Sequence, residues 1–127
     1  MLIDDSETDL FVNKSIIEIH NKSSVVNSFS NASKALQYLR NLDKNSGNFV
    51  NELPEYIFLD INMPLMDAFA FLSEFDELQE SVKEYIKIIL LTSSMNPRDI
   101  QRAHSNKYVK DYIEKPINTD VLGRLFE

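Results

Sequence analysis

Four short apolar runs in this sequence each stop at a polar side chain, and those side chains could together handle a phosphoryl group. The runs are followed by the acid pair Asp4-Asp5, by Asp60, by Thr92 and by Lys115. An ionised carboxylate at the end of a buried strand is rarely there for packing, because a buried charge needs a partner. If the runs are parallel strands, their polar ends lie along one edge of the sheet.

The three acids predict a bound divalent cation. Carboxylates that share one crevice repel each other unless a cation lies among them. The chain has no Cys, and all-oxygen ligation suits a hard ion, Mg²⁺ or Mn²⁺. Protein-bound Mg²⁺ typically uses one or two carboxylates together with a substrate phosphate, so the acids indicate phosphoryl chemistry.

Each polar strand end has a role in such chemistry. Asp60 is the expected nucleophile, since carboxylates form aspartyl-phosphate intermediates. The ammonium of Lys115 can neutralise one phosphoryl oxygen, and the hydroxyl of Thr92 can donate a hydrogen bond to another. Phosphoryl transfer depends mainly on positioning and charge stabilisation, which a metal, a lysine and a hydroxyl supply.

Length, charge and composition exclude several classes of function. A chain of 127 residues fits one domain, and we expect a single domain over residues 1–127, trimmed at both ends from a longer polypeptide. The net charge of -7 and a pI near 4.8 argue against nucleic-acid binding. The apolar runs are too short to span a bilayer, and no signal peptide opens the chain. We therefore expect a cytoplasmic protein with no membrane contact.

Strands and helices must alternate along the chain to position these residues. Strands are expected at residues 2–3, 25–29, 56–60, 88–91 and 108–114. Helices are expected between them on apolar residues at helical spacing: Val12, Ile16 and Ile19; Ala32, Ala35, Leu36 and Leu39; Ala68, Phe71, Leu72 and Phe75; the segment after Asn96-Pro97; and Val121, Leu122 and Leu125. Such alternation predicts right-handed crossovers and a parallel sheet that is covered on both faces.

The predicted fold class is α/β, a flavodoxin-like, doubly wound (βα)5 fold with a parallel five-stranded sheet in the order 2-1-3-4-5. In this order the first and third strands flank the point where the strand order reverses, and ligands bind there. The topology therefore brings Asp4, Asp5 and Asp60 together, although they are far apart in the sequence.

These residues resemble those of the receiver domain of two-component response regulators, and the chain looks like a stand-alone receiver. The matching parts cover essentially the whole chain and are Asp4-Asp5, Asp60 to Asp67, Thr92-Ser93 and Lys115-Pro116. The resemblance implies that Asp60 accepts a phosphoryl group from a sensor histidine kinase or a histidine phosphotransfer protein. It also implies that Asp5, Asp60 and the backbone carbonyl of Asn62 ligate Mg²⁺, and that Asp4 acts mainly through metal-bound water.

The resemblance further implies a switch. Lys115 and Thr92 would bind the phosphoryl group, and the movement of Thr92 would let the ring of Tyr112 turn inward. This would reshape the face formed by the helix after Pro97, the strand with Tyr112 and the last helix, and so change the binding of an output protein. Asn62 and Ser94 would tune the lifetime of the phosphate. The sequence leaves open the cognate kinase, the output partner and a phosphorylation-linked dimer.

One departure from the family and two rival functions remain. Ala68 stands where the family usually has Gly, which would cost about 1 kcal/mol if the backbone there needs a positive φ. The first rival is a Mg²⁺-dependent phosphohydrolase with an Asp nucleophile. Such enzymes have a second Asp two positions after the nucleophile, where this chain has Asn62. The second rival is a degenerate receiver that acts as an interaction module without phosphate, against which the intact site residues argue.

Overall fold

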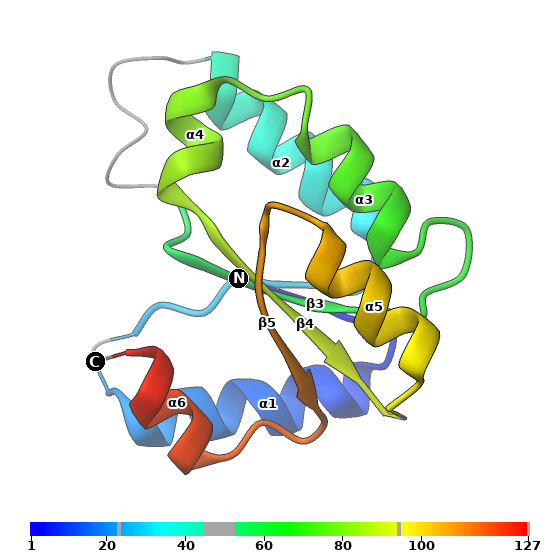
Figure 1. The fold of residues 1–127 in the computed structure, drawn as a ribbon. Coiled ribbons are helices and arrows are strands. Elements are labelled where there is room, and N and C mark those ends of the chain that lie inside the picture. Colours follow the sequence, from blue (N-terminus) through cyan, green and yellow to red (C-terminus); the bar gives the residue numbers. More distant parts are fainter. Residues whose placement is uncertain (23, 45–52, 94, 127) are drawn as a thin grey trace.

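The computed structural model describes residues 1–22, 24–44, 53–93 and 95–126, and a five-stranded sheet carries helices on both of its faces (Figure 1). The strands are β1 (Leu2–Ile3), β2 (Ser28–Phe29), β3 (Tyr56–Asp60), β4 (Lys87–Thr92) and β5 (Val109–Glu114). The helices are α1 (Glu7–His20), α2 (Ala32–Lys44), α3 (Ala68–Phe75), α4 (Glu80–Tyr85), α5 (Pro97–Ser105) and α6 (Thr119–Leu125). None of the helices described is long and apolar enough to cross a membrane.

The strand order is β2-β1-β3-β4-β5, and every neighbouring pair of strands runs parallel. The predicted flavodoxin-like fold is therefore confirmed. In the register of β1 with β3, Ile3 pairs with Leu59. The next residue of each strand is an acid, so the register delivers Asp4 and Asp60 to the same edge of the sheet, where the strand order reverses.

Buried side chains form a hydrophobic cluster on each face of the sheet. Helices α1 and α6 cover one face, and α2, α3, α4 and α5 cover the other (Figure 1). Successive residues of β3 alternate between the clusters: Ile57 and Leu59 pack with α2 and α3, and Phe58 packs with α1 and α6. Burial on both faces is typical of a parallel sheet and explains why β3 and β4 are continuous apolar runs in the sequence.

Two predicted elements differ from the structure. Strand β2 is Ser28–Phe29, and Val25, which was expected in that strand, is exposed. Helix α4 was not predicted, because the only buried residue in it is Val82 and a single apolar residue gives no helical periodicity. The helix that was expected after Pro97 and the last helix are therefore α5 and α6 in the structure.

The buried stripe of α1 also differs from the one expected. Val12 and Ile19 are exposed, whereas Asn13 and Ile17 are buried. The side-chain oxygen of Asn13 accepts a hydrogen bond from the backbone N–H of Ile117 at 3.1 Å, which satisfies this buried amide oxygen and ties α1 to the segment before α6. A polar residue in the middle of the buried stripe made the apolar pattern point to the wrong face of the helix.

Candidate functional site

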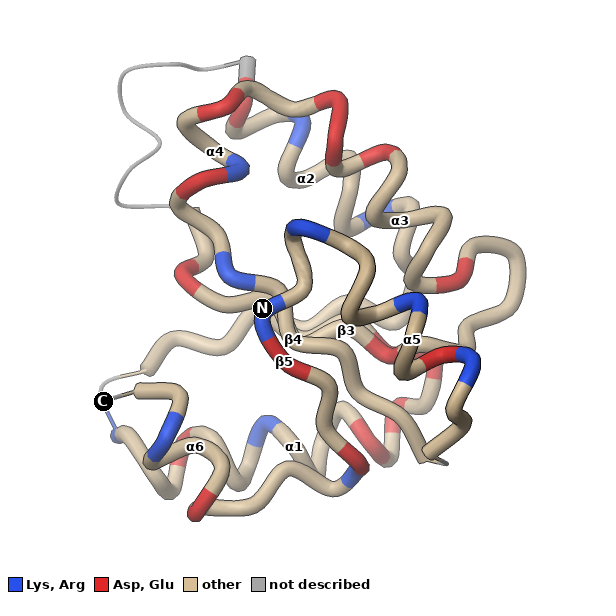
Figure 2. The backbone as a smooth tube through the Cα atoms, in the orientation of Figure 1, with Lys and Arg blue, Asp and Glu red and all other residues tan. Residues whose placement is uncertain are grey.

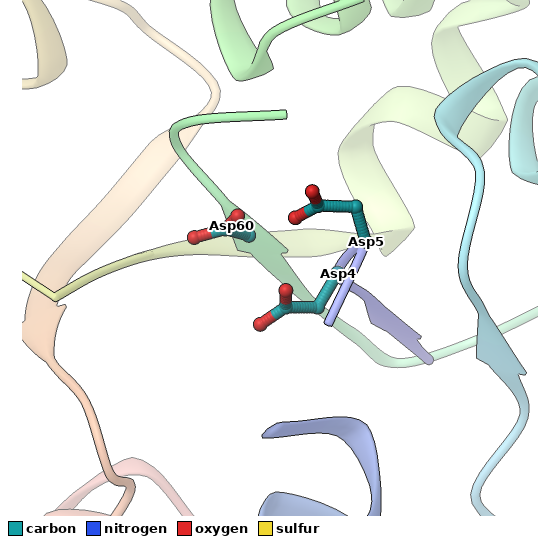
Figure 3. Close-up of side chains that lie close together, drawn as sticks. All are labelled: Asp4, Asp5 and Asp60. Carbon is teal, nitrogen blue, oxygen red and sulfur yellow. The ribbon is translucent and has the colours of Figure 1, made fainter. Parts of the chain in front are cut away.

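Three carboxylates converge where β1 and β3 end. Asp4, Asp5 and Asp60 each offer an oxygen atom, and these atoms all lie within 4.8 Å of one another. In Figure 3 the three carboxylate groups extend to the same side of the two strand ends. Asp4 and Asp60 are buried, and Asp5 is exposed. The side chain of Asp4 is fixed by the backbone N–H of Ser6, which donates to Oδ1 at 2.9 Å.

Lys115 faces this group from the end of β5. Its ammonium lies 2.9 Å from Asp4 Oδ2, 3.2 Å from Asp60 Oδ1 and 2.8 Å from Asp9 Oδ2. The lysine side chain is only 11% exposed, so these contacts are shielded from water. The Lys115-Pro116 peptide bond is cis, and the backbone N–H of Lys115 donates to the carbonyl of Thr92 at 2.7 Å. Figure 2 shows acidic segments (red) gathering where α1 begins and β5 ends.

Burial and like charge perturb the titration of the site. Burial raises the pKa of Asp60 to about 6, and the Asp4 carboxylate adds to this effect, whereas Lys115 opposes it. Burial alone would lower the pKa of Lys115, but its hydrogen bonds to Asp9 and Asp4 and the charge of Asp60 raise that pKa above its ordinary value. The ammonium is therefore charged at neutral pH, and it faces more negative charge than it can neutralise alone.

Thr92 and Tyr112 lie on β4, which is next to β3, and on β5, which is next to β4. Thr92 ends β4, is fully buried and pairs in register with Glu114 of β5. Since Asp60 pairs with Leu91, Thr92 lies one residue beyond the acid on the adjacent strand. Tyr112 is partly buried against the cluster beneath α2, α3 and α5, and no hydrogen-bond partner of its buried hydroxyl is found among the described residues.

We expect the Tyr112→Phe variant to be at least as stable as the wild type. An unpaired buried hydroxyl is costly, so its removal should raise the free energy of unfolding by up to about 1 kcal/mol. Urea denaturation measures this. Tyr56→Phe is the matched control, because the Tyr56 hydroxyl donates to the carbonyl of Leu125 at 2.6 Å, and its loss should cost about 1 kcal/mol. Equal destabilisation of the two variants would contradict the assignment of an unpaired Tyr112 hydroxyl.

The backbone between β3 and α3 shows whether Ala68 needs a positive φ. Ala68 begins α3, is fully buried and has no positive φ, so it carries no backbone penalty. The left-handed position in this loop is Leu65, with a φ of 71°. Asn62, two residues after Asp60, is exposed. Ser94, the other residue expected to tune phosphate lifetime, lies outside the described residues.

The acidic group fits a hard divalent cation. Its donors are carboxylate oxygens from Asp4, Asp5 and Asp60, without His or Cys, which suits Mg²⁺ or Mn²⁺. The exposure of Asp5 leaves an open side for the water ligands that Mg²⁺ keeps. Lys115 supplies one positive charge to a group of three carboxylates. The remaining negative charge would attract a divalent cation.

Asp9 is the site residue that the sequence did not reveal. It lies in the first turn of α1, where acidic residues are common for reasons of helix polarity alone, so its residue type and position do not mark it as a site residue. Asp9 follows Asp5 by four residues, but Asp5 precedes the helix cap at Ser6, so this spacing does not by itself place the two acids on one side of the helix.

Comparisons with known proteins agree with this fold. The chain matches the family described as response regulator receiver domain over residues 1–127. It is 33% identical over 93 residues to the probable methanogenesis regulatory protein FilR2 of Methanothrix harundinacea (strain 6Ac), in an alignment that covers 73% of this chain and 56% of that protein. The alignment thus spans only about half of that relative.

Solved structures of response regulators are similar over nearly the whole chain. A two-component response regulator from Cytophaga hutchinsonii has a TM-score of 0.87 and 28% identity, and the match covers 98% of this chain and 90% of that one. A response regulator receiver protein from Dyadobacter fermentans DSM 18053 has a TM-score of 0.84 and 26% identity, with coverage of 98% and 91%.

Proposed function

Because this chain belongs to the response regulator receiver domain family, we propose that it is a phosphoacceptor switch in which Asp60 is the acceptor. Receiver domains are signalling domains, and the family implies a histidine kinase or a histidine phosphotransfer protein as the upstream partner. The observation that carries the proposal is the Lys115 ammonium, which lies 3.2 Å from Asp60 Oδ1 and 2.9 Å from Asp4 Oδ2 inside a buried acidic site.

In the proposed reaction an oxygen of the Asp60 carboxylate attacks the phosphorus of a phosphohistidine. The phosphorus–nitrogen bond breaks, its electron pair returns to the imidazole of the donor, and an acyl phosphate forms on Asp60. Lys115 then donates to a phosphoryl oxygen in place of Asp60 Oδ1, and the hydroxyl of Thr92 donates to another. Hydrolysis by water regenerates the carboxylate and releases inorganic phosphate.

Mg²⁺ is the cofactor that we propose, held by Asp5, Asp60 and the carbonyl of Asn62, with Asp4 acting mainly through metal-bound water. When bound, it would neutralise negative charge on the carboxylates and on the incoming phosphoryl group. Asp4 has a further role in the chain itself, since one of its oxygens is held by Ser6 and the other by Lys115. Asp4 thereby fixes the position of the lysine relative to Asp60.

The proposed output is a change of the face formed by α5, β5 and α6. Thr92 ends β4, and β4 pairs along its length with β5, which carries Tyr112. A phosphoryl group adds negative charge and strong acceptors beside the Thr92 hydroxyl, and a shift of Thr92 would move the loop that leads into α5. The hydroxyl of Tyr112 has no hydrogen-bond partner within the described part of the chain, which supports a second ring position in which that group gains one. We propose that a cytoplasmic output protein reads this face, with or without dimerisation.

The proposal is tested by the intact mass of the protein after incubation with acetyl phosphate and Mg²⁺. We expect one added phosphoryl group that is labile at alkaline pH. It should be absent with EDTA and absent in the Asp60→Asn variant. The absence of any adduct on a folded wild type whose hydrolysis is slow enough to observe would favour a phosphate-independent interaction module. Sustained consumption of acetyl phosphate without an adduct would instead favour a phosphohydrolase.

A further inference from the structure

Lys115 has a third carboxylate partner in Asp9, which lies outside the group of three acids at the strand ends. The distance from Lys115 Nζ to Asp9 Oδ2 is 2.8 Å, shorter than the 3.2 Å to Asp60 Oδ1. The backbone at Asp9 is fixed by the helix cap, because its N–H donates to Ser6 Oγ at 3.2 Å. The Asp9 side chain is 41% exposed, so it approaches the buried ammonium from the solvent side.

Asp9 is the carboxylate on Lys115 that the phosphoryl chemistry does not otherwise need. An ammonium has three N–H donors, and Asp4, Asp9 and Asp60 together can accept from all three. Asp60 exchanges its contact with Lys115 for a phosphoryl oxygen when it is phosphorylated. Asp4 is a member of the acidic group that fits a cation. Asp9 is not in that group, so its hold on the lysine can persist through the whole cycle.

We propose that Asp9 is a positioning residue for phosphoryl transfer, which holds the Lys115 ammonium in place while Asp60 changes from carboxylate to acyl phosphate. This inference rests on the function proposed above. The lysine side chain is flexible and its ammonium is strongly hydrated. Neighbouring residues must therefore hold the ammonium in one position. Without Asp9, the ammonium has only Asp4 and Asp60 as carboxylate partners among the residues that the structure describes. It would then pair more closely with the nucleophile and be less well placed for the phosphoryl oxygens.

A positioning role and a simple charge effect predict opposite signs, which makes the proposal testable. Removal of the Asp9 charge should, on Coulombic grounds alone, favour the approach of an anionic phosphodonor. Loss of positioning should slow the reaction. Glu7→Gln provides the matched control. Glu7 lies in the same first turn of α1, is exposed, and has no hydrogen bond or ion pair of its side chain in the part of the chain that the structure describes.

The experiment measures the rate of phosphorylation by acetyl phosphate as a function of Mg²⁺ concentration in the wild type, Asp9→Asn and Glu7→Gln. We expect the maximal rate of Asp9→Asn to fall about tenfold, the order found when an outer partner of a site residue is removed. The Mg²⁺ concentration at half-maximal rate should match that of Glu7→Gln, because Asp9 is not a metal ligand. Thermal unfolding followed by circular dichroism confirms that both variants are folded.

Three results would overturn the proposal. If Asp9→Asn reacts as fast as Glu7→Gln, or faster, the contact with Lys115 does not position the ammonium. If Asp9→Asn changes only the Mg²⁺ requirement, Asp9 belongs to the cation site. If the wild type itself acquires no phosphoryl group, the proposed function fails and the role of Asp9 falls with it. The first two results leave a phosphorylated wild type, so they separate the failure of this inference from that of the proposed function.

Discussion

The Asp60→Asn variant is expected to be more stable than the wild type at about pH 8 without metal, although it loses the proposed phosphoacceptor. Burial and the nearby Asp4 carboxylate raise the pKa of Asp60 from 3.8 to about 6. At about pH 8 the folded protein must therefore hold Asp60 ionised in an unfavourable site. Asn has the same shape without the charge, and Lys115 keeps its ion pairs with Asp4 and Asp9.

The pH dependence of this difference has a defined sign. Because the pKa of Asp60 is higher in the folded than in the unfolded chain, the folded state binds more protons between about pH 4 and pH 6. The free energy of unfolding of the wild type should therefore fall as the pH rises through this interval and stay low above it. The cost is at most about 3 kcal/mol, and less where water screens the site. The variant lacks this cost, so its advantage should appear as the pH rises.

Urea denaturation in EDTA at about pH 5 and about pH 8 measures the effect. We expect Asp60→Asn to exceed the wild type by about 1 to 3 kcal/mol at the higher pH and by much less at the lower. Asp120→Asn is the control, since Asp120 is exposed in the first turn of α6 and its charge should matter by less than about 0.5 kcal/mol. A destabilised Asp60→Asn at about pH 8 would mean that the Lys115 contact outweighs burial and repulsion.

The Lys115→Met variant is expected to lose much of its stability at about pH 8 in EDTA and to recover part of it with Mg²⁺. The substitution of Lys115 leaves the buried Asp4 and Asp60 without their ammonium partner. Breaking a buried ion pair from one side typically costs about 3 to 5 kcal/mol. A bound cation can then replace part of the missing charge, so Mg²⁺ should stabilise this variant more than the wild type, through its preference for the folded state.

Urea denaturation with EDTA or with saturating Mg²⁺ tests this prediction, and Lys110→Met is the matched control. Lys110 lies on the same strand, β5, but is exposed, so its replacement should change stability by less than about 0.5 kcal/mol. Similar stability of the two variants in EDTA would show that Asp4 and Asp60 tolerate the loss of the lysine. An equal response of Lys115→Met and wild type to Mg²⁺ would argue against a cation beside Lys115.

The fold and the family were predictable because the signals were regular. Strands β3 and β4 are buried on both faces, which leaves continuous apolar runs that need no structural context to be recognised. The alternation of strands and helices predicts a parallel sheet, and the flavodoxin-like strand order assigned to that sheet is confirmed. Strand β2 was misplaced because Val25 is apolar but exposed, and the backbone pairing of Ser28 with Leu2 leaves no mark in residue type. Helix α4 was missed because it buries little more than Val82.

The site residues at the strand ends were predictable from the sequence, whereas the contact of Asp9 with Lys115 was not. The convergence of Asp4, Asp5 and Asp60 followed from topology, which the structure bears out. The roles given to them remain proposals. The contact of Asp9 with Lys115 depends on how far α1 turns after its cap at Ser6, and on where the chain leaves β5. The spacing of residue types determines neither the turn of α1 nor the path of the chain after β5. Only the three-dimensional structure therefore shows the contact between Asp9 and Lys115.

The ion pair between Asp4 and Lys115 also has a consequence for the timing of synthesis. Its two residues are 111 positions apart in the chain. A ribosome therefore produces Asp4, Asp5 and Asp60 long before it produces the lysine that balances them. Since β5 is the last strand in the sequence, the nascent chain holds Asp60, the proposed acceptor, without the Lys115 charge until almost all of this sequence has been made. The proposed phosphoryl transfer would therefore become possible only in one late step, after Lys115 has been made.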